Sequence, residues 1–132
     1  MEIQDLKPQR ARAAAMMKEH FGMVFTKLEP GEAWSEWPLR EQDINVHGIP
    51  YGGVLYTLAD NTSGMSLGTM SSSVITISSS ASFLTGSPDA KKLIGHAKVT
   101  KMGNSIGFIR SEVYDDQERL LATFEFVFGR KP

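Results

Sequence analysis

The sequence predicts an α+β fold in which one antiparallel sheet wraps around a single long central helix. A largely apolar helical segment runs through the middle of the chain, from Val54 to about Met70. Segments with alternating side chains lie on both sides of this helix, and short turn signals separate them. A long buried helix needs a sheet large enough to curl around it, and strands with short connections pair antiparallel.

The chain begins with a predicted helix at residues 7–20. Pro8 suits the first turn of a helix, and the alanine and methionine residues that follow are strong helix formers. Gly22 is expected to end the helix, because glycine adopts the left-handed conformation found after a last turn.

Two strands are predicted next, at residues 23–29 and 33–40, with a turn at residues 30–32. Proline cannot donate a ladder hydrogen bond, so Pro38 predicts that the second strand is at an edge or bulged at that point. A loop at residues 41–50 then leads to the central helix.

The central helix is expected to be buried along most of its length. Residues at three- and four-residue spacing share one of its faces: Leu55, Leu58, Thr62 and Met65. Gly64 and Gly68 weaken helix propensity but allow another segment to pack closely. Aromatic and methionine candidates for lining a pocket or for the core are Trp34, Trp37, Tyr56, Met65 and Phe83.

Four alternating segments follow the helix and predict an antiparallel meander. The expected strands are residues 74–84, 93–101, 105–114 and 120–128, with turns at residues 86–89, 102–104 and 115–118.

Composition limits the classes of function. The 132 residues are expected to form one domain, and 41% of them are hydrophobic, which is enough for one core. The net charge of −1 gives no electrostatic argument for nucleic acid as a partner. The chain has no cysteine, which excludes disulfides, a thiol nucleophile and thiolate metal sites. The three histidines have no metal-ligand spacing, and we expect neither a metal nor a cofactor.

The first residues lack the basic and apolar regions of a signal peptide. No uninterrupted apolar run approaches the ~20 residues that span a bilayer. We therefore expect a cytoplasmic protein without a membrane partner.

The segment from Asn45 to Asn61 contains the strongest functional signal. It passes from a loop through Gly52-Gly53 into the central helix. Glycines at a helix start leave backbone N–H groups open to a carbonyl oxygen or an anion. Asp60 follows about two turns later on a largely apolar helix. Donors and a lone carboxylate on one helix predict a site that activates a carbonyl group.

The pattern Asn45-x-x-Gly48-x-x-Tyr51-Gly52-Gly53, followed by Asp60, resembles the signature of the PaaI-type (phenylacetate-degradation) acyl-CoA thioesterases. The order of elements is similar to the hot-dog fold of that family. The resemblance implies a hydrolase that cleaves acyl-CoA. It also implies a homodimer as the unit and a homotetramer as the assembly, with each site built from both chains.

The resemblance also implies roles for individual residues. The N–H of Gly52 or Gly53 would polarise the thioester carbonyl, and Asp60 would be a general base for water or a direct nucleophile. Asn45 would hold the attacking water or the oxyanion, and Thr76 would position water.

One position departs from the family pattern, because Tyr51 stands where the family has histidine. His47 lies four residues earlier and does not match that place. Tyrosine can donate a hydrogen bond but does not act as a base near neutral pH. We interpret Tyr51 as a pocket or interface aromatic and His47 as a loop residue at the pocket edge.

The resemblance leaves three candidate functions. The first is a thioesterase. The second is a hot-dog protein that binds acyl-CoA without turnover, and Tyr51 favours this second function. The third is a hot-dog hydratase, whose motif pairing aspartate with histidine is absent. The serine runs have no nucleophile-elbow context, which argues against a Ser-His-Asp hydrolase.

Overall fold

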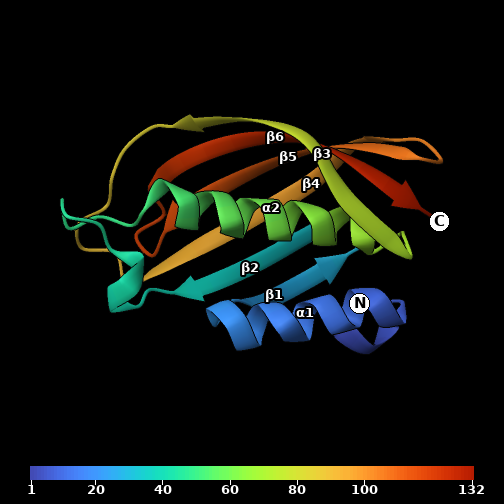
Figure 1. Cartoon of the computed structure of the whole chain (residues 1–132), viewed down its shortest axis with the longest axis horizontal. Coiled ribbons are helices and arrows are strands. Elements are labelled where there is room, and N and C mark those ends of the chain that lie inside the picture. The colour runs from blue at the N-terminus through green and yellow to red at the C-terminus, as the bar shows by residue number, and fades with distance from the viewer.

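A six-stranded antiparallel sheet curls around one long helix in the computed structural model, which describes residues 1–132. The helices are α1 (Pro8–Phe21) and α2 (Gly52–Gly68), with short turns η1 (Ile3–Asp5) and η2 (Glu41–Asp43). The strands are β1 (Val24–Glu29), β2 (Glu32–Pro38), β3 (Ser73–Phe83), β4 (Lys92–Met102), β5 (Ile106–Asp115) and β6 (Leu120–Lys131). Figure 1 shows α2 lying lengthwise on the sheet, with α1 beside β1. The predicted α+β architecture is confirmed.

The predicted elements are all present, with small differences at their ends. The central helix begins at Gly52, before the expected Val54, and ends at Gly68. Gly22 follows α1 with φ of 71°, the left-handed conformation expected of a residue that ends a helix. The pairing of β2 with β1 ends at Glu36, which lies opposite Val24. Pro38, the last residue of β2, therefore has no neighbour on that side, which agrees with the predicted edge position.

The predicted meander is correct for β4, β5 and β6 but wrong for β3. The strand order is β1-β2-β4-β5-β6-β3, so β3 pairs with β6 and β4 pairs with β2. Three strand spacings separate β3 from β4, about 14 Å in all. The connecting residues 84–91 can extend over roughly 26 Å, so this crossing is within their reach. The turn signal at residues 86–89 therefore marks a crossing connection.

The crossing connection is tied to the turn between β5 and β6. Ser87 is buried and donates a hydrogen bond to Oδ2 of Asp115 at 2.8 Å. The Arg119 guanidinium donates to the same oxygen at 2.6 Å and to Asp89 at 2.7 Å. The contacts of Ser87 and Asp89 are long-range, alternation along the chain does not encode them, and they fix the path of the connection from β3 to β4.

Lowering the pH is expected to weaken this anchor. Burial alone would raise the pKa of Asp115, but hydrogen bonds from the backbone of Arg119, from Ser87 and from the Arg119 guanidinium lower the pKa to about 2. A carboxyl group with a lowered native pKa contributes stability above its unfolded pKa of 3.8, and that stability is lost as the pH falls toward 2.

We expect the free energy of unfolding to fall by about 1–2 kcal/mol through this group between pH 5 and pH 2, because solvent screens part of the interaction. Urea denaturation at a series of pH values measures it. Asp115→Asn should lose this part of the pH dependence, and Glu118→Gln, on the exposed part of the same turn, should keep it. An unchanged slope in Asp115→Asn would contradict the assignment.

The core lies between α2 and the inner face of the sheet. Leu58, Thr62 and Met65 have no exposed surface and Leu55 is 6% exposed, which confirms the predicted buried face of the helix. A Cβ at Gly64 would lie 3.1 Å from the ring of Phe128. The expected close packing at this glycine is therefore present.

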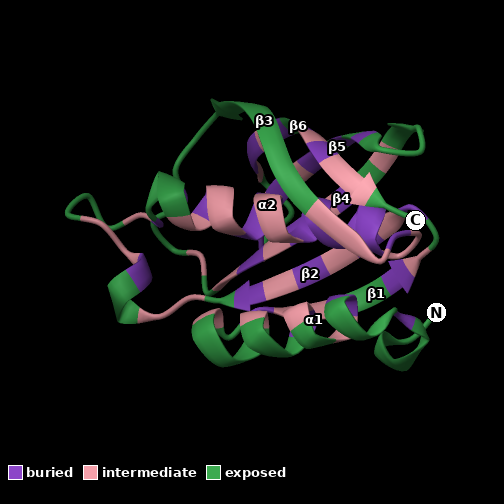
Figure 2. Ribbon diagram, turned by 45° about the vertical axis from the view of Figure 1, so that its right-hand side comes forward, coloured by how far each residue is buried: buried purple, intermediate pink, exposed green.

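β3 differs from the other strands because both of its faces are open. Figure 2 shows it exposed along most of its length, while the neighbouring strands carry buried positions. Ile75 is 69% exposed and Ile77 is 57% exposed. As the last strand of the sheet, β3 also leaves one edge of its backbone unpaired. The alternating pattern of this segment therefore does not produce a buried face within one chain.

Candidate active site

The start of α2 presents two backbone donors that have no acceptor in the chain. Tyr51 precedes the helix with φ of −58° and ψ of 142°, and its side chain makes no capping hydrogen bond. The first backbone hydrogen bonds of the helix are donated by the N–H groups of Val54 and Leu55 to the carbonyl oxygen of Tyr51. The N–H groups of Gly52 and Gly53 therefore remain free. Both glycines are exposed. The positive end of the helix therefore offers open donors, as the sequence predicts.

The preceding loop is held in shape by Asn45. Its Oδ1 accepts hydrogen bonds from the N–H of His47 at 2.9 Å and of Ile49 at 3.3 Å. Gly48 allows the tight turn because its φ is 77°. The side-chain oxygen of Asn45 thus orders the loop, and its amide nitrogen has no partner within the chain.

The side chains of His47 and Tyr51 both face solvent. His47 is exposed on the loop, and Tyr51 is 49% exposed at the helix start. Neither side chain forms a hydrogen bond within the chain. Tyr51 directly precedes the free donors, and neither Tyr51 nor His47 has a side-chain partner within the chain.

A cleft of about 280 Å³ lies at this end of α2, and we call it the glycine cleft. Phe83 packs against the helix start, 3.5 Å from the position a Cβ would take at Gly52. The cleft is lined by Asn45, Ile49, Pro50, Gly52, Leu55, Phe83, residues 84–87 and Leu121.

Asp60 lies farther along α2 and is bound by Thr76 of β3. The Thr76 hydroxyl donates to Oδ1 of Asp60 at 2.7 Å. Burial raises the pKa of Asp60, and the hydrogen bond from Thr76 opposes that rise. A half-buried carboxyl group with a raised pKa is suited to accept a proton.

Asp60 and Thr76 line a second cleft, of about 300 Å³, which we call the aspartate cleft. It lies between α1, α2, β3 and β6. Its lining residues are Arg10, Ala13, Met17, Asp60, Asn61, Gly64, Val74, Ile75, Thr76 and Phe128.

Arg10 is the residue of this cleft that the sequence reasoning missed. Its side chain is only 8% exposed, although it carries a charge. The signal was present in the helical spacing, because Arg10 falls in line with Ala14, Met17 and Phe21 on the inward face of α1.

The two clefts have no lining residue in common. Asp60 comes eight residues after Gly52, a rise of about 12 Å along the helix. One chain therefore brings Asp60 together with Thr76, and Asn45 together with Gly52, but it keeps these two pairs apart.

Among the pocket candidates, only Phe83 lines either cleft. Trp37 and Met65 are buried in the core, and Trp34 stacks on His96. Tyr56 shares a hydrogen bond with Ser79 of β3 at 2.6 Å, which joins the helix to the edge strand.

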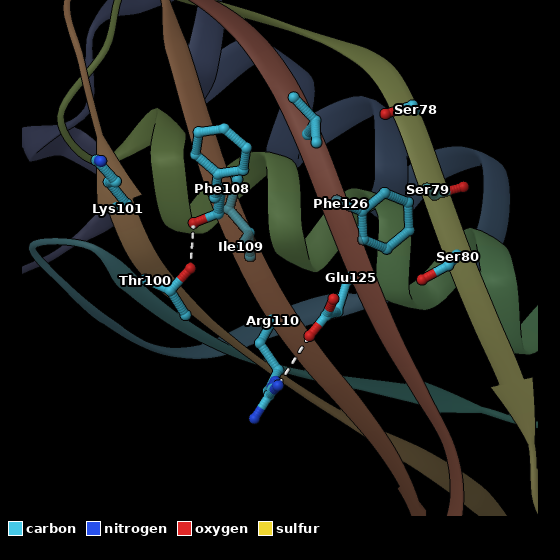
Figure 3. A pocket seen from close by; sticks show the side chains of 11 residues that line it. Ser78, Ser79, Ser80, Thr100, Lys101, Phe108, Ile109, Arg110, Glu125 and Phe126 are labelled. Carbon is cyan, nitrogen blue, oxygen red and sulfur yellow. Dashed lines mark hydrogen bonds and ion pairs between the residues drawn. The ribbon is translucent and has the colours of Figure 1, made fainter.

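A larger hollow, of about 710 Å³, lies along β3, β4, β5 and β6. In Figure 3 the sheet stands in front of α2 at this place, and Arg110 points to Glu125 across neighbouring strands. These two side chains form an ion pair at 2.8 Å. None of the predicted site residues lines this hollow, so the two smaller clefts are the candidate site.

Comparison with protein families gives a match to the model of the thioesterase superfamily over residues 47–122. This segment includes α2, the strands β3, β4 and β5, and the start of β6. A curated protein of Archaeoglobus fulgidus with the word esterase in its name is 22% identical over 96 residues. The match covers 73% of this chain and 62% of that protein, so this chain spans less than two thirds of the relative's length.

Solved structures share the fold. A mutant of the phenylacetic acid degradation protein PaaI from Thermus thermophilus matches with a TM-score of 0.80 at 23% identity, over 87% of this chain and 98% of that chain. PaaI from E. coli matches with a TM-score of 0.82 at 21% identity, over 96% of each chain. A thioesterase from Haemophilus influenzae matches with a TM-score of 0.79 at 14% identity, over 88% and 85% of the two chains. None of the helices here has the length and apolar character needed to cross a membrane.

Proposed function

Because this chain belongs to the thioesterase superfamily and has the hot-dog fold of the PaaI structures, we propose that it hydrolyses an acyl-CoA thioester to the free acid and coenzyme A. The observation that carries the proposal is the pairing of chemistries on α2. Free N–H donors stand at its start, and a half-buried carboxyl group with a raised pKa follows. Thioester hydrolysis needs both an acceptor for the proton of water and donors for the oxyanion.

In the proposed mechanism Asp60 is the general base. It takes a proton from water as the water oxygen bonds to the thioester carbon. The charge that develops on the carbonyl oxygen is stabilised by the N–H groups of Gly52 and Gly53. The carbon–sulfur bond then breaks, and the leaving sulfur takes the proton from Asp60. Thr76 holds Oδ1, which leaves Oδ2 for water.

The amide nitrogen of Asn45, which has no partner within the chain, would donate to the oxyanion or to water. The alternative role of Asp60, attack on the carbonyl to form an anhydride, uses the same groups.

We propose that the active unit is a homodimer in which each site combines the aspartate cleft of one chain with the glycine cleft of the other. Thr76 lies at one cleft and Phe83 at the other, both on the inner side of β3. Antiparallel pairing of two β3 edges centred near Ser80 would bring Thr76 opposite Phe83 of the partner subunit. Thr76 and Phe83 are seven residues apart, so a regular strand would point them to opposite faces. The bulge at Ile77 shifts the alternation by one residue and places Thr76 and Phe83 on the same face of β3.

Three features support this pairing. The β3 edge is unpaired, its faces are open, and the clefts are separate within one chain. A homotetramer built from two such dimers remains a prediction.

Mixing two inactive variants is expected to restore activity if the site is shared. Co-expressed Asp60→Ala and Gly52→Pro chains would form heterodimers in which one of the two sites carries both native residues. Random pairing makes half of the dimers mixed, and one of the two sites in each mixed dimer is intact, so we expect about a quarter of the wild-type activity. Thiol release from the purified mixture measures this. Activity no higher than that of either variant alone would place Asp60 and Gly52 of one site in the same chain.

Thiol release from a panel of acyl-CoA compounds tests the function itself. The panel runs from acetyl to palmitoyl and includes phenylacetyl and benzoyl thioesters. Release that disappears in Asp60→Ala supports a thioesterase that uses this carboxylate. No release from any member of the panel would contradict the proposed activity.

Tyr51 favours a second candidate, a protein that binds acyl-CoA without hydrolysing it. Its half-exposed side chain has no hydrogen-bond partner and stands where the family has histidine. Calorimetric binding of acyl-CoA by a chain that releases no thiol would support this candidate.

A further inference from the structure

Arg10 is a buried cation that has no partner in the chain. The guanidinium forms no ion pair and no hydrogen bond, and its Nε is enclosed without an acceptor. Burial lowers the pKa of Arg10, because it disfavours the charged form. An enclosed donor without an acceptor reduces stability, and Nε is such a donor. The two terminal nitrogens are not enclosed and have no acceptor in the chain, so they can bind a group from outside it.

The packing around Arg10 leaves room for its aliphatic part. A Cβ at Gly68 of α2 would lie 2.7 Å from Cδ of Arg10, so a larger residue there would displace the arginine. Met65 lies beside the same position. The helix thus provides a place for the side chain, and only its head lacks a partner.

Arg10 and Asp60 line the same cleft with apolar surface between them. Ala13, Val74 and Phe128 contribute that surface, and Gly64 lines the cleft beside them. Cδ of Arg10 lies against Gly68, which follows Asp60 by about two turns of α2, or about 12 Å, so the arginine side chain enters the cleft from the end away from Asp60. An acyl group whose carbonyl lies at Asp60 would extend over the apolar surface toward Arg10.

We propose that Arg10 determines substrate specificity by binding a carboxylate at the far end of the acyl group. The substrates would then be monothioesters of short dicarboxylic acids, with a chain of roughly four to six carbons to fit the distance between the ends. A guanidinium suits this role because its N–H groups match a carboxylate in two parallel hydrogen bonds. This inference rests on the proposed function, because it places the thioester carbonyl at Asp60.

Matched pairs of thioesters test the inference. Succinyl, glutaryl and adipyl-CoA are compared with butanoyl, pentanoyl and hexanoyl-CoA, which have the same chain lengths without the terminal charge. In the native protein we expect kcat/KM to be at least about tenfold higher for the best dicarboxylic compound than for its neutral counterpart. Arg10→Met should lower that ratio by about 10- to 100-fold, and Arg10→Lys should keep part of it.

Arg12→Met is the matched control, because Arg12 is an exposed arginine on the same helix. Its ratio should equal that of the native protein. The melting temperature of Arg10→Met should stay the same or rise, since an unpaired buried charge is removed. A purely structural role for Arg10 would instead lower the melting temperature and leave the ratio unchanged.

Binding measured without turnover separates this inference from the proposed function. Calorimetry with Asp60→Asn should give a lower Kd for the dicarboxylic compound of each pair, and Arg10→Met in that background should remove the difference. A preference in Kd, together with no thiol release by the native protein, would overturn the thioesterase and keep the anion site. Equal ratios in the native protein and in Arg10→Met would overturn the inference. If the native protein and Arg10→Met have equal kcat/KM ratios and Arg10→Met no longer forms the dimer, the inference is also overturned. Arg10 would then pair with a carboxylate of the partner subunit.

Discussion

Asp60→Asn is expected to lower kcat by about three orders of magnitude while acyl-CoA binding persists. Asparagine has the size of aspartate and still accepts the hydrogen bond from Thr76. It cannot accept a proton from water, so only the chemical step should be affected. Thiol release gives kcat, and calorimetry gives the Kd. Glu19→Gln makes the same chemical change at an exposed position on α1 and should leave both unchanged.

The pH dependence provides a second measure of the same carboxyl group. Activity requires the deprotonated form of Asp60, and burial raises its pKa above the ordinary value of 3.8. The acidic limb of kcat/KM against pH should therefore lie above pH 3.8. Thr76→Val should move the limb to higher pH, because the hydrogen bond favours the charged form, whereas Thr76→Ser should not. A limb that does not move in Thr76→Val would contradict the role of this contact.

Isotope labelling tests whether Asp60 acts as a nucleophile whose anhydride is opened at the Asp60 carbonyl. In a single turnover in ¹⁸O-water, a general base directs the label into the product acid. Label in the peptide that contains Asp60 would show that an anhydride had formed. That result would reassign the role of Asp60 while leaving the expected effect of Asp60→Asn intact.

Gly52→Pro is expected to lower kcat by about 10²- to 10³-fold, because proline has no N–H to donate to the oxyanion. The helix should tolerate the change. Gly52 is the first residue of α2, where proline is favoured, and its φ is not positive. Tyr51 already has the extended conformation that a following proline requires. The measurements are kcat from thiol release and the melting temperature.

Gly52→Ala is the matched control, because it adds a Cβ and keeps the N–H. That Cβ would meet the ring of Phe83 at 3.5 Å, an ordinary contact distance, so kcat should stay within a few-fold of the native value. A similar loss in both variants would mean that the added side chain, and not the missing donor, lowers the activity. An active Gly52→Pro would assign the oxyanion to Gly53 or to Asn45.

The local sequence was enough to predict the central helix, the open N–H groups at its start and the carboxylate of Asp60. The spacing of Leu55, Leu58 and Met65 fixed the buried face, because residues three and four apart share a side of any helix. The glycine pair at the helix start predicted open N–H groups from local geometry alone. The position of Asp60 on that helix followed in the same way.

The pairing of strands was beyond the reach of this reasoning. Alternation shows that β3 is a strand but does not specify its partner, since any edge with unpaired backbone can accept it. In the structure β3 pairs with β6 along its whole length, and Ser87 and Asp89 tie the connection that follows β3 to the turn between β5 and β6.

The sequence by itself thus determined the α+β class, the buried helix and the segment that carries the candidate chemistry, because these depend on neighbours along the chain. Only the tertiary structure brought Thr76 to Asp60, enclosed Arg10 in the same cleft and kept the glycine cleft apart. These arrangements depend on which elements pack together across the chain. Long-range packing sets that choice, and the periodicity of one segment does not record it.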